Sequence, residues 1–428
     1  MAEETKCLRL SKFKEFIAAN KDSVAGNESM RSCVTRSSNE TYRVNSEERH
    51  AEIVSCIWSN LTSKGCPPDF KLKLMHYCTQ QLEQEELYST KECEINVDDD
   101  TLKPQYDLLK LQKFVVNHLN KLLIKLTDNA SADQLQNFAD NELCKQLNDC
   151  KCTLLPSTCT HAVAFLKNKP RKMEDRYVCL ERFGEMFKLS NKDYRFFGVF
   201  DGHSGALSAC YVTNQLPYLL AQQLQMDTRA QINAEFYRNA FETVFLQANQ
   251  RFTQKRITSG TTAVCALIAT NHLYVAWVGD SKALLVGKRM HLQLVKPHKP
   301  EANDERRRIE AAGGTVIHAQ GQWRVNGILN VARSIGDYSV EAVIAEPDFV
   351  DLELNEAHDF LVMGTDGLWD HVPEAYIIEA VYESLANETI KLEDIPKLLI
   401  EAAKERDSQD NITVILELLK PREQIVNG

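Results

Sequence analysis

The chain has 428 residues, 43% of them hydrophobic, which is enough apolar material for more than one folded domain. Its formal net charge is −10 and it has no basic run that could follow a phosphate backbone, so the sequence argues against a nucleic-acid partner. The N-terminus lacks an apolar signal core, and no stretch approaches the ~18 consecutive apolar residues of a membrane-spanning helix. We therefore expect a protein of the cytoplasm, with the nucleus as an additional location and no membrane partner.

Two regions precede the strand-rich part of the chain. Residues 1–45 are polar apart from an amphipathic stretch at about residues 8–17, and we predict a mobile segment there. Residues 46–152 have helical periodicity, which predicts a separate all-helical domain. Its longest helix is marked by apolar residues at steps of three and four: Leu108, Leu111, Val115, Leu119, Leu122 and Leu126. This stripe would pack in the domain core or, as the alternative, receive a helix of a protein partner.

Two shorter signals follow that helix. Ser131 and Gln134 form a capping box, which predicts that another helix begins there. The 13 cysteines are an odd number without the spacing of a disulfide framework, so we expect free thiols. One cluster could supply four soft ligands to zinc, although its spacing matches no common zinc pattern: Cys150, Cys152, Cys159 and His161. Free thiols are the favoured interpretation, and a metal site or a redox-sensitive pair is the alternative.

The third region, residues 153–428, has the period of β-strands. Four apolar and β-branched runs predict two successive antiparallel hairpins: residues 262–269 with 273–279, and residues 283–286 with 291–295. Helical patterns occupy three stretches: residues 205–254, which Pro217 interrupts, residues 374–386 and residues 394–406. Strand meanders with helices outside them predict an α+β domain in which two packed antiparallel sheets are covered by helices.

Acidic residues stand where apolar runs of this region start or stop. Asp201 directly follows the apolar run at residues 196–200, and Asp410 stands two residues before the run that starts at residue 412. The full set has five members: Glu174, Asp175, Asp201, Asp366 and Asp410. An Asp-Gly pair alone is a common turn signal, but five carboxylates at strand ends predict a shared rim. Oxygen ligands of this kind suit Mg²⁺ or Mn²⁺, and two such ions can clamp both oxygens of a phosphoryl displacement.

In these motifs the chain resembles the metal-dependent Ser/Thr protein phosphatases of type 2C. The resemblance covers about residues 160–420, and the motifs stand in the family's order. They are Met173-Glu174-Asp175, Asp201-Gly202-His203, Gly279-Asp280, His298-Lys299-Pro300, Gly336-Asp337, Asp366-Gly367 with Asp370, and Asp410-Asn411. The resemblance implies an αββα sandwich and in-line attack on phosphoserine or phosphothreonine by a water that bridges two Mg²⁺ or Mn²⁺ ions.

The resemblance also implies a role for each residue of the site. Four carboxylates and one carbonyl would hold the two ions, with Asp201 as the bridge: Glu174, Asp201, Asp366, Asp410 and the carbonyl of Gly202. Asp280 and Asp370 would join Asp366 in a weaker third metal site. Asp175 would orient metal-bound water, and His203 would protonate the leaving group.

One position departs from the family's pattern. Many members carry an arginine four residues before the glutamate of the Met-Glu-Asp motif, where it grips the substrate phosphate, but this chain has Pro170 there. We predict that the adjacent Arg171 takes over this contact. On a strand, however, a shift by one residue would turn the side chain to the other face.

We predict a protein Ser/Thr phosphatase that acts in signalling. The long N-terminal extension and the sequence around Met173 resemble those of one branch of the family. This branch contains the calcium/calmodulin-dependent-kinase phosphatases, also called partner-of-PIX phosphatases, and their nematode sex-determination relative. That branch implies phosphoprotein substrates, with protein kinases among them. Two alternatives stay open: a catalytically weak or silent adaptor with a phosphatase fold, and a metal-dependent hydrolase of small phosphoesters.

Overall fold

The structure is a computed structural model that describes these residues: 11–13, 15–19, 41–84, 93–95, 104–128, 160–226 and 233–427. The chain divides into two compact units, Met1–Ser157 and Thr158–Gly428. The predicted boundary between residues 152 and 153 lies outside the described residues. So do the predicted capping box at Ser131 and three members of the predicted cysteine cluster, Cys150, Cys152 and Cys159.

The described residues bear on two further expectations. Their cysteines are all free thiols, as predicted: Cys56, Cys66, Cys78, Cys93, Cys179, Cys210 and Cys265. None of the helices in the described ranges is both long and apolar enough to cross a membrane.

Three helices dominate the N-terminal unit: α2 (Arg49–Ser63), α3 (Pro68–Gln84) and α4 (Leu108–Asp128). The predicted striped helix is α4, and its apolar stripe is buried. The expectation of an all-helical domain needs a correction, because three short strands form a sheet in the order β1-β3-β2: β1 (Arg43–Asn45), β2 (Glu94–Ile95) and β3 (Gln105–Asp107). Strands of two or three residues are too short to show a period in the sequence.

Part of the polar N-terminal segment packs against α3. Residues 11–13 and 15–19 are helical, within the predicted amphipathic stretch. Phe13 is fully buried, and its ring stacks on that of Phe70 with the centroids 4.1 Å apart. Burial of these aromatic rings ties the stretch to the rest of its unit.

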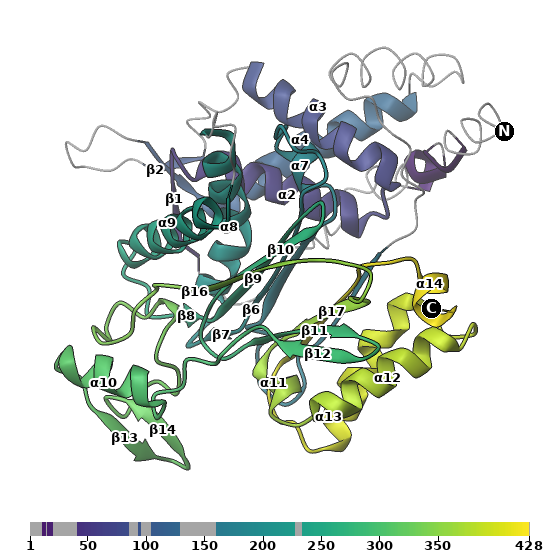
Figure 1. The fold of residues 1–428 in the computed structure, drawn as a ribbon. Helices are drawn as coiled ribbons and strands as arrows, with labels where there is room; N and C mark the ends of the chain where they lie inside the picture. Colours follow the sequence, from purple (N-terminus) through teal and green to yellow (C-terminus); the bar gives the residue numbers. More distant parts are fainter. Residues whose placement is uncertain are drawn as a thin grey trace. The chain divides into compact units, whose positions relative to one another are not determined.

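Two five-stranded antiparallel sheets form the centre of the C-terminal unit (Figure 1). The first has the order β16 (Asp348–Glu353), β10 (His272–Val278), β9 (Ala263–Ala269), β6 (Arg195–Phe200) and β5 (Arg176–Leu180). The second has the order β12 (Met290–Gln293), β11 (Lys282–Gly287), β17 (Phe360–Gly364), β18 (Ile412–Leu418) and β4 (His161–Leu166). The two predicted hairpins are β9–β10 and β11–β12, one in each sheet.

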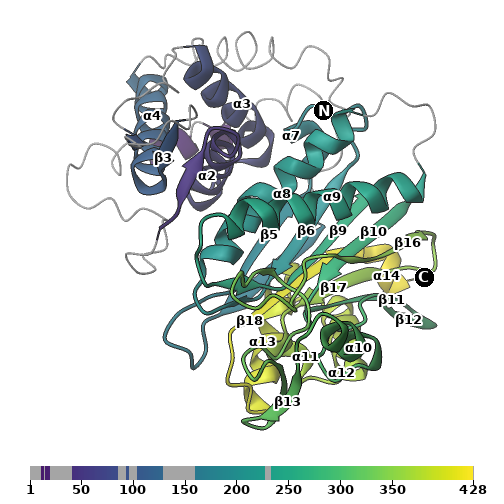
Figure 2. The same ribbon diagram turned by 90° about the vertical axis from the view of Figure 1, so that its left-hand side faces the viewer.

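Figure 2 shows that helices cover the outer face of each sheet, which completes the predicted αββα sandwich. Helices α8 (Leu207–Met226) and α9 (Ala234–Thr253) lie on the first sheet. Helices α11 (Asp366–Trp369), α12 (Glu374–Ala386) and α13 (Ile395–Glu405) lie on the second. Between the sheets, side chains such as Phe197 and Val264 pack against Leu285 and Leu361. Both β17 and β18 are buried on both faces, so β17 is a continuous apolar run and β18 is apolar apart from Thr413 and Glu417.

The expectation that Pro217 interrupts the helical region is wrong. Helix α8 continues through Pro217, and it ends instead at Met226. A proline inside a helix costs roughly 3 kcal/mol, whereas full burial of a leucine contributes about 1.5–3 kcal/mol. Leu216, Leu219 and Leu220 around the proline are at most 1% exposed, so their burial offsets the cost.

Two small sheets complete the C-terminal unit. Helix α10 (Asn303–Ala311) packs on the hairpin of β13 (Val316–Ala319) and β14 (Gln322–Val325) around a separate apolar core. The other sheet joins three strands of two residues in the order β15-β8-β7: β15 (Ile335–Gly336), β8 (Gly260–Thr261) and β7 (Gly202–His203).

Candidate active site

The structure brings the predicted acidic residues together at one end of the two sheets. Strands β6 and β17 end there and are followed by Asp201 and Asp366, and β18 begins there after Asp410. The electrostatic effects of the carboxylates on one another show which of them share the rim. The rim contains six aspartates: Asp175, Asp201, Asp280, Asp366, Asp370 and Asp410.

Burial and mutual repulsion raise the pKa values of three of these carboxyl groups. The pKa of Asp201 lies well above its usual value, first because the group is buried and then because Asp366 repels it. The pKa of Asp366 rises to about 8 through burial and through the charges of Asp280 and Asp410. The pKa of Asp175 rises to about 7, mainly through burial. Added positive charge would therefore stabilise the ionised rim.

Two hydroxyl groups fix one oxygen of Asp175. Thr413 Oγ1 and Thr365 Oγ1 donate hydrogen bonds to Asp175 Oδ2 at 2.8 and 3.0 Å. The backbone N–H of Thr413 donates to Thr365 Oγ1 at 3.0 Å, which ties the ends of β17 and β18 together. The other carboxylate oxygen, Asp175 Oδ1, is buried and has no hydrogen-bond partner among the described residues.

Glu174 reaches the rim from the loop between β4 and β5. Its backbone N–H donates to Asn411 Oδ1 at 2.6 Å, and its Oε2 accepts from the backbone N–H of Gly205 at 3.0 Å. Asn411 Nδ2 donates in turn to the carbonyl oxygen of Lys167 at 2.7 Å, so Asn411 anchors this loop. Gly202 has no room for a side chain, because a Cβ there would lie 2.5 Å from the carbonyl oxygen of Glu174.

The sheet of β7, β8 and β15 positions His203. Asp337 directly follows β15, and its Oδ2 lies 2.7 Å from His203 Nε2. The Asp337 side chain is 4% exposed, and Ser334 Oγ donates to the same oxygen at 2.5 Å. Gly260 of β8 lies against both groups, because a Cβ there would be 1.9 Å from Asp337 Oδ2 and 2.4 Å from His203 Nε2. A buried carboxylate therefore fixes the orientation of the His203 ring.

Residues 160–412 match the family described as Protein phosphatase 2C, and this match covers more than half of the chain. The chain belongs to the protein phosphatase 2C family. It is 38% identical to human Protein phosphatase 1F over 269 residues, which are 61% of this chain and 58% of that protein. It is 33% identical to the mouse protein of the same name over 394 residues, which are 89% of this chain and 82% of that protein.

Solved structures share the fold of this phosphatase 2C chain. A C. elegans sex determining protein has a TM-score of 0.73 at 20% identity, and the likeness covers 97% of this chain and 96% of that one. A serine-threonine phosphatase 2C from Toxoplasma gondii has a TM-score of 0.53 at 21% identity, over 62% of this chain and 98% of that one. The predicted fold class is confirmed by these likenesses. The predicted family and branch are confirmed by the family match and by the matches to protein phosphatases 1F and 1E.

The rim of this phosphatase 2C domain fits hard divalent cations by charge rather than by preformed geometry. In the described ranges, no three His, Cys, Asp or Glu side chains converge closely enough to form a cation site by themselves. Such convergence is not required for Mg²⁺, which usually keeps several waters and takes one or two protein carboxylates. Asp175 Oδ1 and Asp366 Oδ1 are buried oxygens without a hydrogen-bond partner among the described residues. Repelling carboxylates with open acceptor positions are the donor set that Mg²⁺ and Mn²⁺ prefer.

Sequence reasoning gave no role to two residues that the structure places in the candidate site. Asp337, which holds His203, was noted only as part of the Gly336-Asp337 motif. Lys299 Nζ forms an ion pair with Asp280 Oδ2. Burial lowers the pKa of Lys299, but nearby carboxylates, with Asp280 first, outweigh burial and raise it overall. The His298-Lys299-Pro300 motif was the signal that could have indicated this lysine.

Arg171, the predicted phosphate-binding cation, lies in the loop between β4 and β5. The expectation that its side chain would face the wrong side of a strand does not apply, because residues 167–175 contain no strand. Arg171 is exposed, and its guanidinium group finds no hydrogen-bond or ion-pair partner in the part of the chain that the structure describes. It follows Pro170 on the same loop that presents Glu174 to the rim.

Proposed function

We propose that the protein is a Mg²⁺- or Mn²⁺-dependent protein Ser/Thr phosphatase in which water attacks the phosphorus in line. One observation carries the proposal: a rim of mutually repelling carboxylates lies beside a histidine that is fixed by a buried aspartate. The first group suits divalent cations, and the second suits proton transfer. Membership of the protein phosphatase 2C family supports the same activity.

Four carboxylates and one carbonyl would hold two ions, as the resemblance implies: Glu174, Asp201, Asp366, Asp410 and Gly202. When bound, the ions would lower the pKa of a water molecule toward neutrality and offset the charge of the phosphoryl group. Asp175 would orient water through its free Oδ1, because its Oδ2 is already bonded to Thr365 and Thr413. Asp280 and Asp370 would form the weaker third site with Asp366, and Lys299 already supplies one positive charge beside Asp280.

His203 would donate a proton to the leaving oxygen of serine or threonine. Because its Nε2 is engaged with Asp337, the proton would come from Nδ1. An alkoxide is a poor leaving group, and proton donation of this kind contributes roughly 10²- to 10⁴-fold. Arg171 would contact the substrate phosphate from the adjacent loop. A free arginine can make a charge-assisted, two-point contact with phosphate.

We propose phosphoproteins as the substrates, with protein kinases among them, by analogy with the phosphatase branch to which the chain is similar. The apolar stripe of helix α4 in the N-terminal unit is buried. A partner of that unit would therefore bind another of its surfaces.

A comparison of substrate classes tests this proposal. With Mn²⁺ present, the full chain should hydrolyse a phosphothreonine peptide much faster than a mononucleotide, and Asp366→Asn should abolish both activities. Faster hydrolysis of the mononucleotide would favour a phosphatase of small phosphoesters. If neither substrate turned over with Mn²⁺ or Mg²⁺, the fold would serve as a silent adaptor.

A further inference from the structure

A second polar site lies at the opposite end of the strands that form the acidic rim. It is a cleft of about 900 Å³ lined by residues of both sheets. Arg195, Asp359 and Lys420 lie at or next to the ends of β6, β17 and β18 that point away from the rim. Since β6 has six residues at roughly 3.3 Å each, the cleft lies roughly 20 Å from the rim. A ligand in the cleft would therefore not touch the catalytic residues.

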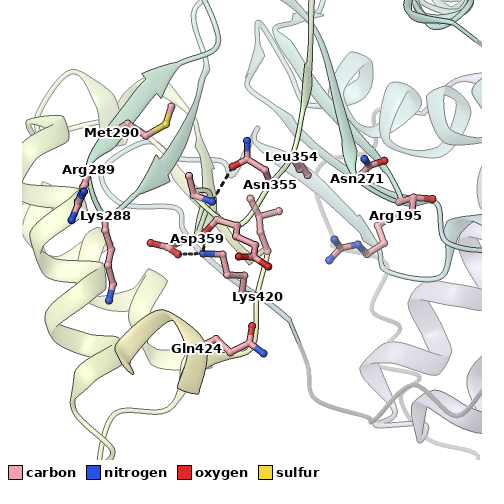
Figure 3. Close-up of a pocket in the computed structure, with 14 residues that line it drawn as sticks. Arg195, Asn271, Lys288, Arg289, Met290, Leu354, Asn355, Asp359, Lys420 and Gln424 are labelled. Atoms are coloured by element: carbon pink, nitrogen blue, oxygen red, sulfur yellow. Dashed lines mark hydrogen bonds and ion pairs between the residues drawn. The ribbon is translucent and has the colours of Figure 1, made fainter. Parts of the chain in front are cut away.

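Figure 3 shows how the cleft is built. Arg195 and Asn271 come from the first sheet, and Lys288, Arg289 and Met290 lie on the other side of the cleft, in the turn and strand of the β11–β12 hairpin of the second sheet. Asp359 and Lys420 lie between the two groups. The lining thus contains four cationic side chains and two carboxylates, Glu356 and Asp359, although the chain as a whole has a net charge of −10.

The two inner cations are already paired with buried carboxylates. Lys420 Nζ donates to Asp359 Oδ1 at 2.7 Å, and Tyr382 Oη donates to Asp359 Oδ2 at 2.7 Å. Arg195 forms an ion pair with Glu417, whose side chain is 1% exposed. Lys420 Nζ also donates to the carbonyl oxygen of Glu356. These contacts fix Arg195 and Lys420 in place, and they leave several N–H groups of Arg195 and one of Lys420 that can donate to a ligand.

The two outer cations have no partner. Lys288 and Arg289 are exposed in the turn, and neither forms a hydrogen bond or ion pair within the described part of the chain. Adjacent like charges repel each other, so a bound anion would relieve this repulsion. Arginine and lysine side chains together are the usual means of binding phosphate in proteins.

The remaining lining is apolar and limits the size of the ligand. Met290, Leu354, Ala357 and Leu419 contribute apolar atoms to the wall, and Met290 is 41% exposed. Clefts of about 300–1,000 Å³ with a few polar groups on an apolar wall are typical of small-molecule sites. An inorganic anion alone would leave this wall uncovered.

We propose that this cleft binds a small organic phosphate, with the phosphate group at Lys288 and Arg289 and the organic part against Met290 and Leu354. The site is separate from the acidic rim and does not depend on the proposed phosphatase activity. Its ligand would be a regulator of the protein rather than a substrate, because the cleft contains no group placed to attack phosphorus.

Calorimetric titration of the full chain tests the proposal, with a chelator present so that cations do not recruit phosphate to the rim. The probes are adenosine monophosphate, adenosine and inorganic phosphate. Adenosine monophosphate should bind saturably at one site, and both fragments should bind at least about tenfold more weakly. Lys288→Glu with Arg289→Glu should weaken its binding at least about tenfold, and since both residues are exposed in a turn, the variant should fold normally.

Two matched variants show whether binding depends on this cleft. Lys391→Glu with Lys404→Glu makes the same change in net charge at exposed positions outside the cleft, and it should leave binding unchanged. Asp201→Asn at the rim should also leave binding unchanged. Absence of saturable binding by adenosine monophosphate would overturn the proposal. So would retention of binding in the Lys288 and Arg289 variant, or an equal loss in the Lys391 and Lys404 variant.

Discussion

Replacement of Asp337 by asparagine tests how the site positions its general acid. Asp337 Oδ2 lies 2.7 Å from His203 Nε2, and its side chain is almost fully buried. Asparagine keeps the size of the side chain and removes the charge. Its backbone also suits the position, because Asp337 has a φ of 48° and asparagine adopts this left-handed conformation readily. The variant should therefore fold, while the orientation of His203 is weakened.

The magnitude follows from the bond that is lost. A hydrogen bond to a charged group contributes about 1.5–3 kcal/mol, and about 1.4 kcal/mol corresponds to a tenfold change in rate. Asp337→Asn should lower kcat for a phosphothreonine peptide by roughly 10- to 100-fold. The loss on an aryl phosphate should be less than about threefold, because its leaving group needs no proton.

Steady-state kinetics on both substrates provides the assay. Ser334→Ala removes the hydroxyl donor to Asp337 but keeps the carboxylate, so it serves as the control and should have a smaller effect. In a His203→Ala background, Asp337→Asn should have no further effect on kcat. Equal losses on the peptide and the aryl phosphate would show that Asp337 supports only the fold, and the reasoning would be refuted.

Three further predictions concern single residues of the C-terminal unit. Asp201→Asn should lower turnover at least about 100-fold, and near-normal turnover would contradict the bridging role. The same variant should raise the melting temperature of the metal-free protein, because it removes a buried carboxylate that its neighbours repel. Arg171→Ala should raise KM for the peptide roughly 10- to 100-fold with kcat little changed, and the neighbouring Lys169→Ala should not; an unchanged KM would contradict the phosphate contact. Burial raises the pKa of Glu417 from 4.5 to about 7, so the folded protein holds a proton that the unfolded chain releases, and stability should fall as the pH rises from 4.5 to 7. The Glu417→Gln variant should not lose stability over this pH range, and melting temperatures measured from pH 4.5 to 7 test this. If the melting temperatures of the variant and the unmodified protein changed with pH in parallel, the assignment to Glu417 would be wrong.

The strands that carry the site could be predicted because each combines an apolar run with an acidic residue at its end. Residues 196–200 of β6, 360–364 of β17 and 412–416 of β18 are buried on both faces, and they are apolar apart from Thr413. The carboxylates that follow or precede those runs were therefore predicted to meet at one rim of the sheets. The αββα arrangement was implied by the family resemblance, and the likeness to solved structures confirms it.

The pairing of His203 with Asp337 could not be predicted, because 134 residues separate them. The sheet that brings them together has strands of two residues, which leave no period in the sequence. The small sheet of the N-terminal unit could not be predicted for the same reason, because its strands are also very short. Lys299 was missed because its role depends on which carboxylate it meets in the folded protein. The prediction that Pro217 interrupts the helix was wrong, because burial of the leucines around it outweighs the low helix propensity of proline.

The central claim is that the acidic rim works through divalent cations, and an add-back titration tests it most directly. The protein is stripped with a chelator, and turnover of a phosphothreonine peptide is measured as Mn²⁺ is added back. The account predicts no measurable turnover in the stripped protein and saturable recovery with Mn²⁺, and Asp201→Asn should fail to recover. Turnover that remained unchanged after exhaustive chelation would contradict the account.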